Sequence, residues 1–300
     1  MRQGDKVGTL AIVGQGFIGA RIARLALSDG WKVRALARRQ PEQQLAPGQE
    51  LLVGDARDPE LVLELLTGAD HVVFAAGTAK PAESNQHPMH EIAANLSPLL
   101  AVLKAMPQTS VGGITLLSSG GTVYGPDAPT PTPETAPLWP ISGYGVLKVT
   151  SERYVGMHAR QHGIAADILR CANVYGPGEP THGSQGLIGV TRAALRAHRP
   201  VVVYGDGSAR RDFVHVDDVA AAVMGLAARP DGVRVLNVGS GCSVSVREVV
   251  EAVAGSLGMP ATFEHRPGRP ADVPVVELDV SALRGIIEFA PRSLPEGLAG

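Results

Sequence analysis

The stretch VGTLAIVGQGFIG, residues 7–19, decides the fold. It is an apolar run that ends in a glycine-rich turn, and the following residues 17–29 have the apolar spacing of a helix. Gly14, Gly16 and Gly19 form a GxGxxG motif between the strand and the helix, and this context gives a short motif its weight. The stretch therefore predicts a strand–turn–helix unit whose turn receives a phosphate group.

Each glycine of the turn has its own physical reason. Gly14 permits the tight turn, Gly16 lets a pyrophosphate approach the backbone, and Gly19 lets the helix pack closely on the strand. The N-terminus of the helix, which starts with Phe17 and Ile18, supplies N–H donors and positive potential. A glycine turn could occur in any α/β protein, but its place after the first strand favours a dinucleotide cofactor.

The alternation of strand and helix continues along the chain. Apolar runs typical of strands lie at 33–37, 51–53, 71–76, 114–119, 164–170 and 233–239, and helical patterns lie at 58–67, 87–106 and 143–162. Strand–helix–strand crossovers require a parallel sheet with helices on both faces. We therefore predict an α/β protein with a doubly wound parallel Rossmann sheet.

After residue 172 the rhythm weakens into loops rich in glycine and proline, with a strand-like run at 200–204 and a helix near 245–257. This change predicts an NAD(P)-binding Rossmann domain over residues 1–172. Residues 173–300 are then mainly a smaller substrate-binding lobe, from which residues 205–239 return to the Rossmann domain. The proline-rich loop 126–140 could border a substrate cleft.

Composition excludes several classes of partner. The 27 basic and 29 acidic side chains give a formal charge of -2, so we expect no nucleic acid and no membrane surface as a partner. The first apolar run is too short for a secretory signal or a membrane span. Cys171 and Cys242 lie outside any zinc spacing, and the histidines lack ligand spacing, so we expect no metal and a cytoplasmic location.

The end of the second predicted strand selects the cofactor. An NAD site usually has an acidic residue there, but this chain reads VRALARR over residues 33–39. Arg38 and Arg39 could hold a 2'-phosphate between them, so NADP(H) is favoured and NAD is the alternative. The two arginines could instead be solvated surface charges.

Two aspartates follow the third predicted strand. Asp55 can accept a hydrogen bond from an adenine amino group at the strand end. Asp58 precedes Pro59 at the start of the next helix, which is the pattern of a helix cap. We therefore predict Asp55, rather than Asp58, as a cofactor contact.

Tyr144 and Lys148 are the candidate catalytic pair. They stand four residues apart on a predicted helix, so they share one face. A nearby ammonium group favours the phenolate form of a tyrosine, which suits proton transfer to or from a sugar-type hydroxyl. The spacing alone also fits an exposed amphipathic helix, but hydroxyls at Ser118, Ser119 and Thr122 lie at the predicted carboxyl edge of the sheet, where such folds bind ligands.

Together these motifs resemble the extended short-chain dehydrogenase/reductase family, which contains nucleotide-sugar epimerases, dehydratases and ketoreductases. The resemblance extends over nearly the whole chain and is carried by GQGFIG (14–19), GDARD (54–58), FAAG (74–77), SSGGTVYG (118–125), YGVLK (144–148), LRCANVYGPG (169–178), RRDFVHVDDVA (210–220) and RPGRPADVP (266–274). It implies a sheet of about seven strands, a smaller C-terminal lobe, and Tyr144 as the acid/base.

The resemblance also implies the remaining contacts. Cofactor contacts would include Ala56, Ala75, Ala76, Gly77 and Ser118. Asn173, Arg211 and Arg269 would bind the diphosphate of a nucleotide-diphosphate sugar, and Tyr204 would lie against its base. Taken singly, Asn173 could be a turn residue and Arg211 a partner of Asp212 or Asp217. Relatives of this type often form homodimers, and we expect one here.

Departures from the family pattern narrow the reaction. Gly120 stands where the family usually has a catalytic Ser or Thr, so the hydroxyl would come from Thr122, which we favour, or from Ser119. Gly121 and Thr122 replace the Asp-Glu pair of the dehydratases, so dehydration is disfavoured. The arginine pair favours NADPH-dependent reduction of a 4-keto sugar nucleotide, with NAD-dependent 4-epimerisation as the alternative. Gly120 also leaves open a non-catalytic ligand-binding protein, which the Tyr144 and Lys148 pair opposes.

Overall fold

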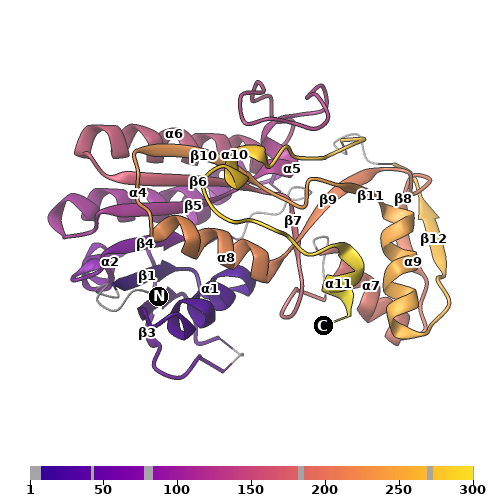
Figure 1. Ribbon diagram of the computed structural model, residues 1–300, viewed down its shortest axis with the longest axis horizontal. Helices are drawn as coiled ribbons and strands as arrows, with labels where there is room; N and C mark the ends of the chain where they lie inside the picture. The colour runs from indigo at the N-terminus through magenta and orange to yellow at the C-terminus, as the bar shows by residue number, and fades with distance from the viewer. Residues whose placement is uncertain (1–7, 42–43, 78–83, 182–185, 269–272, 300) are drawn as a thin grey trace.

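The structure, a computed structural model, describes residues 8–41, 44–77, 84–181, 186–268 and 273–299. Its larger part is built on one seven-stranded sheet (Figure 1). The strands are β1 (Thr9–Val13), β2 (Lys32–Ala37), β3 (Glu50–Val53), β4 (His71–Phe74), β5 (Gly113–Ser119), β6 (Ala165–Cys171) and β10 (Val233–Val238). Their order is β10-β6-β5-β4-β1-β2-β3, and every neighbouring pair is parallel. The predicted doubly wound Rossmann sheet is confirmed.

Helices cover both faces of this sheet. They are α1 (Phe17–Ser28), α2 (Pro59–Leu66), α3 (Pro88–Glu91), the π-helical turn η1 (Ile92–Leu96), α4 (Ser97–Ala105), the 3-10 turn η2 (Met106–Gln108), α5 (Gly120–Val123), α6 (Gly143–His162) and α8 (Val216–Ala227). One core cluster joins α1 and α8 to the sheet, and a second joins α2, α4 and α6 to the opposite face. Because successive strand residues point to opposite faces, the strands are apolar throughout and their core residues divide between the two clusters.

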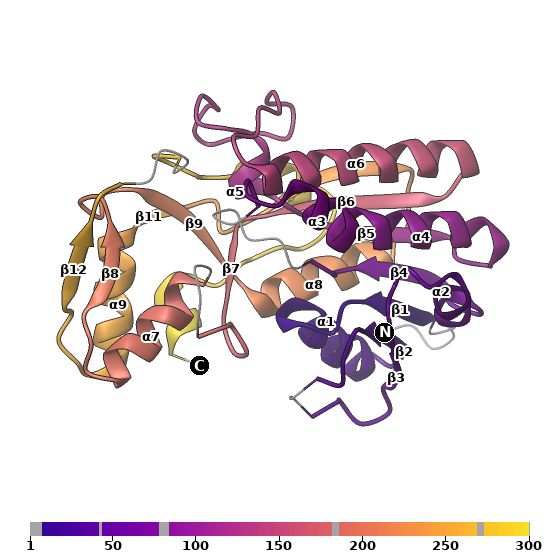
Figure 2. The same ribbon diagram turned by 180° about the vertical axis from the view of Figure 1, so that it is seen from behind.

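A smaller lobe lies beyond the carboxyl edge of the sheet, as Figure 2 shows from behind. It contains β7 (Asn173–Tyr175), α7 (Leu187–Arg196), β8 (Val201–Tyr204), β9 (Arg210–His215), β11 (Ser243–Ser245), α9 (Val246–Leu257), β12 (Phe263–Arg266) and α11 (Leu294–Leu298). The sheets β11-β9-β7 and β12-β8 are built around a third core cluster. This architecture fits the predicted C-terminal lobe.

The chain crosses between the two parts more than once. After β9, the helix α8 and the strand β10 lie in the Rossmann part, and residues 276–289, including α10 (Ser281–Arg284), add Leu278, Val280 and Leu283 to its first core cluster. We propose the sequence-based division of the chain with this later segment added to the Rossmann domain. Within the described ranges, no helix combines the length and apolar character needed to cross a bilayer.

Candidate active site

The glycine turn between β1 and α1 has the geometry expected of it. Gly14 has φ +104°, and a Cβ there would lie 2.6 Å from the backbone nitrogen of Ala76. A Cβ on Gly19 would lie 1.9 Å from the carbonyl oxygen of Gly14, so α1 packs tightly against the turn. Around Gly16, by contrast, nothing lies within 4 Å of the position of a Cβ. The turn therefore offers open space and helix N–H groups where a pyrophosphate would bind.

The ends of β2 and β3 lie beside this turn. Arg38 and Arg39 are exposed after β2. The carboxylate of Asp55 accepts hydrogen bonds from the guanidinium of Arg57, the shortest at 2.5 Å. This hydrogen bond holds the pKa of Asp55 below its ordinary value, and Arg38 adds to the effect. Asp58 accepts hydrogen bonds from the first backbone N–H groups of α2, so its predicted capping role is confirmed.

Tyr144 and Lys148 lie in the first turns of α6, where several contacts fix the helix start. The hydroxyl of Ser142 caps the helix by accepting from the N–H of Gly145 at 3.1 Å. The N–H of Tyr144 donates to the hydroxyl of Ser84 at 3.0 Å. Lys148 donates from Nζ to the carbonyl oxygen of Leu117 at 2.8 Å, and its Nζ lies 5.5 Å from the centre of the Tyr144 ring. The predicted pair is therefore assembled on one helix face, beside the end of β5.

The sequence left open whether Thr122 or Ser119 supplies the hydroxyl that would complete the site. Thr122 lies on α5, its Oγ1 donating to the carbonyl oxygen of Ser119 at 3.5 Å, and a Cβ on Gly145 would lie 2.6 Å from the carbonyl oxygen of Thr122. The helix with Thr122 and the helix with Tyr144 therefore approach closely. Ser118, expected to contact the cofactor, is buried and donates to Glu152 at 2.5 Å.

Gly120, where the family pattern places a hydroxyl, is enclosed. A Cβ at this position would lie 2.6 Å from Cδ1 of Leu278 and 3.0 Å from the carbonyl oxygen of Arg170. A serine or threonine would therefore force Leu278, which is 1% exposed, to move. The departure from the family pattern is a packing feature, because the C-terminal segment occupies the space that a side chain would need.

A small cavity beside the pair shows residues that the sequence reasoning missed. It has a volume of about 20 Å³ and is lined by Phe74, Ala76, Asn95, Leu116, Tyr144, Leu147, Lys148 and Ser151. Its lining is mainly apolar, and the polar groups come from Asn95, Tyr144, Lys148 and Ser151. Asn95 reaches it from η1, and π-helical turns of this kind are frequent at functional sites. No local signal in the sequence marks η1, because the apolar pattern over 87–106 continues through it.

The residues predicted to bind substrate are dispersed over the lobe. Asn173 begins β7, and its Oδ1 lies 3.6 Å from the position of a Cβ on Gly121, next to α5. Arg211 is on β9 and donates to the carbonyl oxygen of Arg210 at 2.8 Å. Tyr204 ends β8, in register with Arg266 of β12. Arg269 lies outside the described residues. The structure thus places Asn173 beside α5, and Arg211 and Tyr204 on the lobe strands.

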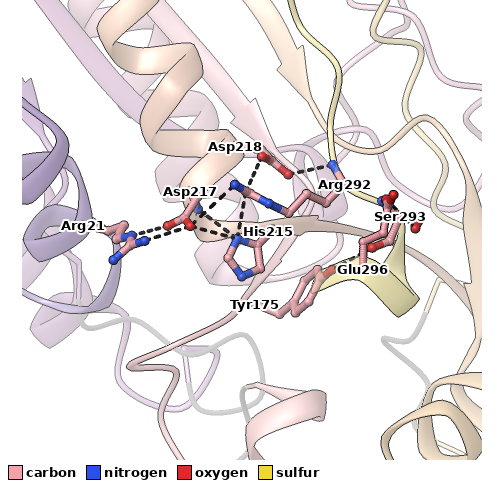
Figure 3. A network of polar contacts seen from close by, with 8 residues as sticks. All are labelled: Arg21, Tyr175, His215, Asp217, Asp218, Arg292, Ser293 and Glu296. Carbon is pink, nitrogen blue, oxygen red and sulfur yellow. Dashed lines mark hydrogen bonds and ion pairs between the residues drawn. The ribbon is translucent and has the colours of Figure 1, made fainter. Parts of the chain in front are cut away.

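A network of charged groups joins α1, the helix that follows the glycine turn, to residues 292–296 near the C-terminus (Figure 3). Arg21 of α1 forms two hydrogen bonds with the carboxylate of Asp217 on α8, one of them 2.8 Å long. Arg292 donates to Asp218 at 2.6 Å and lies 3.2 Å from Nδ1 of His215. Burial lowers the pKa of His215, so its neutral ring can accept the N–H of Asp217. The network therefore fixes the lobe relative to the helix that begins at the glycine turn.

Comparison with known proteins identifies the family. The sequence matches the NAD dependent epimerase/dehydratase family over residues 11–239. The chain belongs to this family. The match includes the glycine turn, the Tyr144 and Lys148 pair and β10, so the resemblance to the extended short-chain dehydrogenases/reductases is confirmed. The protein is an enzyme of the nucleotide-sugar epimerase/reductase type.

Individual members of the family are similar over different lengths. UDP-glucose 4-epimerase of Mycolicibacterium smegmatis is 31% identical, over 97% of this chain and 96% of its own. dTDP-4-dehydro-6-deoxyglucose reductase of Escherichia coli is 28% identical, over 64% of this chain and 60% of its own. A crystal structure of UDP-glucose 4-epimerase from Thermus thermophilus in complex with NAD has a TM-score of 0.88 and 30% identity, covering 97% of this chain and 96% of that one.

Acidic, histidine and cysteine side chains are scattered through the described part of the chain. Within these ranges, no group of three or more of them could hold a metal ion. The polar groups that the structure gathers at the candidate site are those of Tyr144, Lys148 and the nearby hydroxyls.

Proposed function

We propose that this protein is a 4-epimerase of a nucleotide-diphosphate sugar. The observation that carries the proposal is the Tyr144 and Lys148 pair at the carboxyl edge of the sheet, on the same edge as the open glycine turn. The sequence alone favoured net reduction. We now favour epimerisation, because the similarity to a 4-epimerase spans 97% of the chain and the similarity to a reductase spans 64%.

The residues of the chain have the following roles in this reaction. The phenolate oxygen of Tyr144 accepts the proton of the C4 hydroxyl as that carbon is oxidised, and the same phenol returns the proton after the sugar has presented its other face. Lys148 stabilises the phenolate by its charge. The hydroxyl of Thr122, favoured over Ser119, donates to the sugar oxygen and holds it near Tyr144. A bound nicotinamide supplies the hydride acceptor and donor.

The turn and the ends of β2 and β3 fit a dinucleotide. Gly16 leaves room for the pyrophosphate, and the N-terminus of α1 would supply its donors. Asp55, two residues after β3, would accept a hydrogen bond from the adenine amino group. The start of α1 at Phe17 and Ile18, the buried Ala56 and the strand-end residues Ala75, Ala76 and Gly77 complete the proposed contacts.

Reduction of a 4-keto sugar nucleotide by NADPH is the second candidate. The specific observation in its favour is the exposed Arg38 and Arg39 at the end of β2, where a 2'-phosphate could be held by two guanidinium groups. The likeness to a dTDP-4-dehydro-6-deoxyglucose reductase supports the same chemistry. In that reaction Tyr144 protonates the developing alkoxide and is reprotonated from solvent.

One pair of assays separates the candidates. The purified protein is incubated with NAD and UDP-glucose or UDP-galactose, and in parallel with NADPH and a dTDP-4-keto-6-deoxy sugar. Interconversion of the 4-epimers without consumption of NADPH is the expected result. NADPH oxidation that depends on the keto sugar would establish the reductase instead. Tyr144→Phe is the control in both assays, and turnover that survives this substitution would exclude the mechanism.

Substrate contacts and assembly complete the proposal. Asn173, Arg211 and Arg269 bind the diphosphate, and Tyr204 lies against the base. The homodimer would use the exposed apolar side chains of α3, η1 and α6, which are Met89, Ile92, Val146, Tyr154 and Met157. Leu96, Leu99 and Leu103 belong to the core and are not available for an interface. The free Cys171 and Cys242 support a cytoplasmic location.

A further inference from the structure

A row of buried polar residues crosses three strands beneath α6. Ser118 of β5, Arg170 of β6 and Asn237 of β10 occupy paired positions in the register, so their side chains lie on one face of the sheet. Each is at most 5% exposed. Glu152 of α6, 4% exposed, meets this row, accepting from Ser118 at 2.5 Å and from Nη2 of Arg170 at 2.7 Å. Nε of Arg170 also donates to the same carboxylate, so the pair is bidentate.

Apolar packing gives α6 little information about its register on the sheet. The structure describes every residue of this helix, and its buried positions are Gly145, Ser151, Glu152, Val155, Gly156, His158 and Ala159. Val155 is the one large apolar side chain among them, and Leu147 and Val149 pack against the core clusters from partly buried positions. These few apolar contacts specify the register of the helix only weakly. A buried ion pair with fixed geometry is a device for specifying register. Glu152 supplies that fixed point.

Glu152 lies on the same face of α6 as the candidate catalytic pair. Tyr144, Lys148 and Glu152 are spaced by four residues and share one face of α6. Lys148 donates to the carbonyl of Leu117, and Glu152 accepts from the next residue of β5, Ser118. Two successive turns of α6 therefore hold two successive residues of one strand, and Tyr144 lies one turn beyond them.

The guanidinium of Arg170 also contacts the segment that follows α5. Nη1 of Arg170 donates to the phenol oxygen of Tyr124 and to the carbonyl oxygen of Glu134, both at 3.0 Å. Tyr124 directly follows α5, which carries Thr122, and Glu134 lies in the proline-rich loop. The phenol of Tyr124 donates onward to Asn237 at 2.6 Å. Arg170 thus contacts α6 through Glu152 and α5 through Tyr124.

We propose that Glu152 and Arg170 are positioning residues that set the separation between Tyr144 on α6 and Thr122 on α5. This inference rests on the proposed function, because it assigns the pair a role in the proton transfer there. Neither residue touches the reacting atoms in this account. Both act through the helices that they hold, and a displacement of about 1 Å at a catalytic group can lower a rate by about 100-fold.

The test replaces both charges at once. In E152M/R170M the two buried charges disappear together, which leaves no uncompensated ion and lets the chain fold. The matched control is D167M/R234M, a second ion pair that joins Asp167 of β6 to Arg234 of β10 with an N–O distance of 2.6 Å, on the face of the sheet that α1 and α8 cover. We expect kcat to fall by about tenfold or more in E152M/R170M with KM for the sugar nucleotide within about twofold, and both constants to stay near wild type in the control.

Equal kcat values in the two double variants and the wild type would overturn the inference, as would a rise in KM at unchanged kcat. Amide hydrogen exchange of the folded proteins provides a readout independent of turnover. We expect faster exchange in residues 120–125 and 143–149 of E152M/R170M and not in the control, and unchanged exchange in both segments contradicts the proposal. A wild-type protein without turnover on any sugar nucleotide would refute the proposed function, while the exchange experiment would still test whether the pair holds the two helices.

Discussion

Two polar rows cross the same three strands, on opposite faces of the sheet. Ser118, Arg170 and Asn237 face α6, and Thr115, Asp167 and Arg234, three positions earlier on each strand, face α1 and α8. An odd spacing of three reverses the face, because side chains alternate along a strand. Each row has an arginine paired with a buried carboxylate. Arg170 pairs with Glu152 of α6, and Arg234 pairs with Asp167 of its own row.

The two ion pairs differ in the segments of the chain that their side chains contact. Arg170 connects β6 to α6, which carries Tyr144, to Tyr124, which directly follows the helix α5, and to the proline-rich loop. Asp167 and Arg234 connect neighbouring strands to each other at the amino end of the sheet. The same chemistry therefore serves positioning at the carboxyl end, where the loops and ligands of such sheets lie, and strand pairing at the amino end.

The largest expected effect is on catalysis at the carboxyl end. Tyr144→Phe removes the group that exchanges the substrate proton, so we expect kcat to fall by about 10²- to 10⁴-fold. Steady-state kinetics with the sugar nucleotide measures this loss, and circular dichroism confirms that the fold is kept. His71→Gln, a substitution at the amino end, is the matched control and should leave kcat near wild type. Comparable losses of kcat in both variants would show that the carboxyl and amino ends of the sheet do not differ in their role in catalysis.

Single substitutions in the two ion pairs should differ in stability. Arg170→Met leaves Glu152 as an unpaired buried charge, which typically costs about 3–5 kcal/mol of the free energy of unfolding. Arg234→Met should cost less, because burial already raises the pKa of Asp167 and this carboxyl can become neutral by taking up a proton. Denaturant unfolding at neutral pH measures both losses. An equal or larger loss for Arg234→Met would contradict this difference between the pairs.

The amino end should also respond to acid. His71 is buried beside Thr115, 2.8 Å from its hydroxyl, and burial lowers the pKa of the ring from 6.5 to about 4. The unfolded chain therefore takes up a proton that the folded chain refuses, and about 3 kcal/mol of stability, present above pH 6.5, is lost as the pH falls toward 4.

His71→Gln should remove this part of the acid sensitivity. Its free energy of unfolding, measured by urea titration at several pH values, should fall less than that of the wild type between pH 6.5 and 4. Parallel curves for the two proteins over this range would show that His71 does not carry the effect. Carboxylates titrate in both proteins, so their contribution cancels when the pH dependence of the free energy of unfolding is compared between the two.

The smallest effect is expected where an ion pair is exposed. Arg34 and Glu50 join β2 to β3 at 2.8 Å, but the Glu50 side chain is 68% exposed. Water screens such a pair, so Glu50→Gln should change the free energy of unfolding by about 0–1 kcal/mol. Thermal unfolding measures the change. A loss as large as that of Arg170→Met would show that burial does not control the value of these pairs.

Local patterns in the sequence predicted much of this molecule. The helix expected over residues 143–162 has those bounds, and the glycine turn, the cap at Asp58 and the strands of the main sheet follow because each depends on neighbouring residues. The short strands of the lobe were harder to predict. Strand β9 reads RRDFVH and includes a fully buried Asp212, whose carboxylate is satisfied by groups from residues 240, 241 and 278. No local pattern contains such partners.

The sequence by itself determined the Rossmann architecture, the position of the phosphate-binding turn and the pairing of Tyr144 with Lys148, because these depend on residues within one or two turns of each other. Only the tertiary structure decided why Gly120 is a glycine, which groups hold Ser118, and that Arg170 connects two helices of the site. These features arise from contacts between residues that are 30 to more than 150 positions apart in the chain, and their physical basis is the burial of charge and volume in a space that the whole fold encloses.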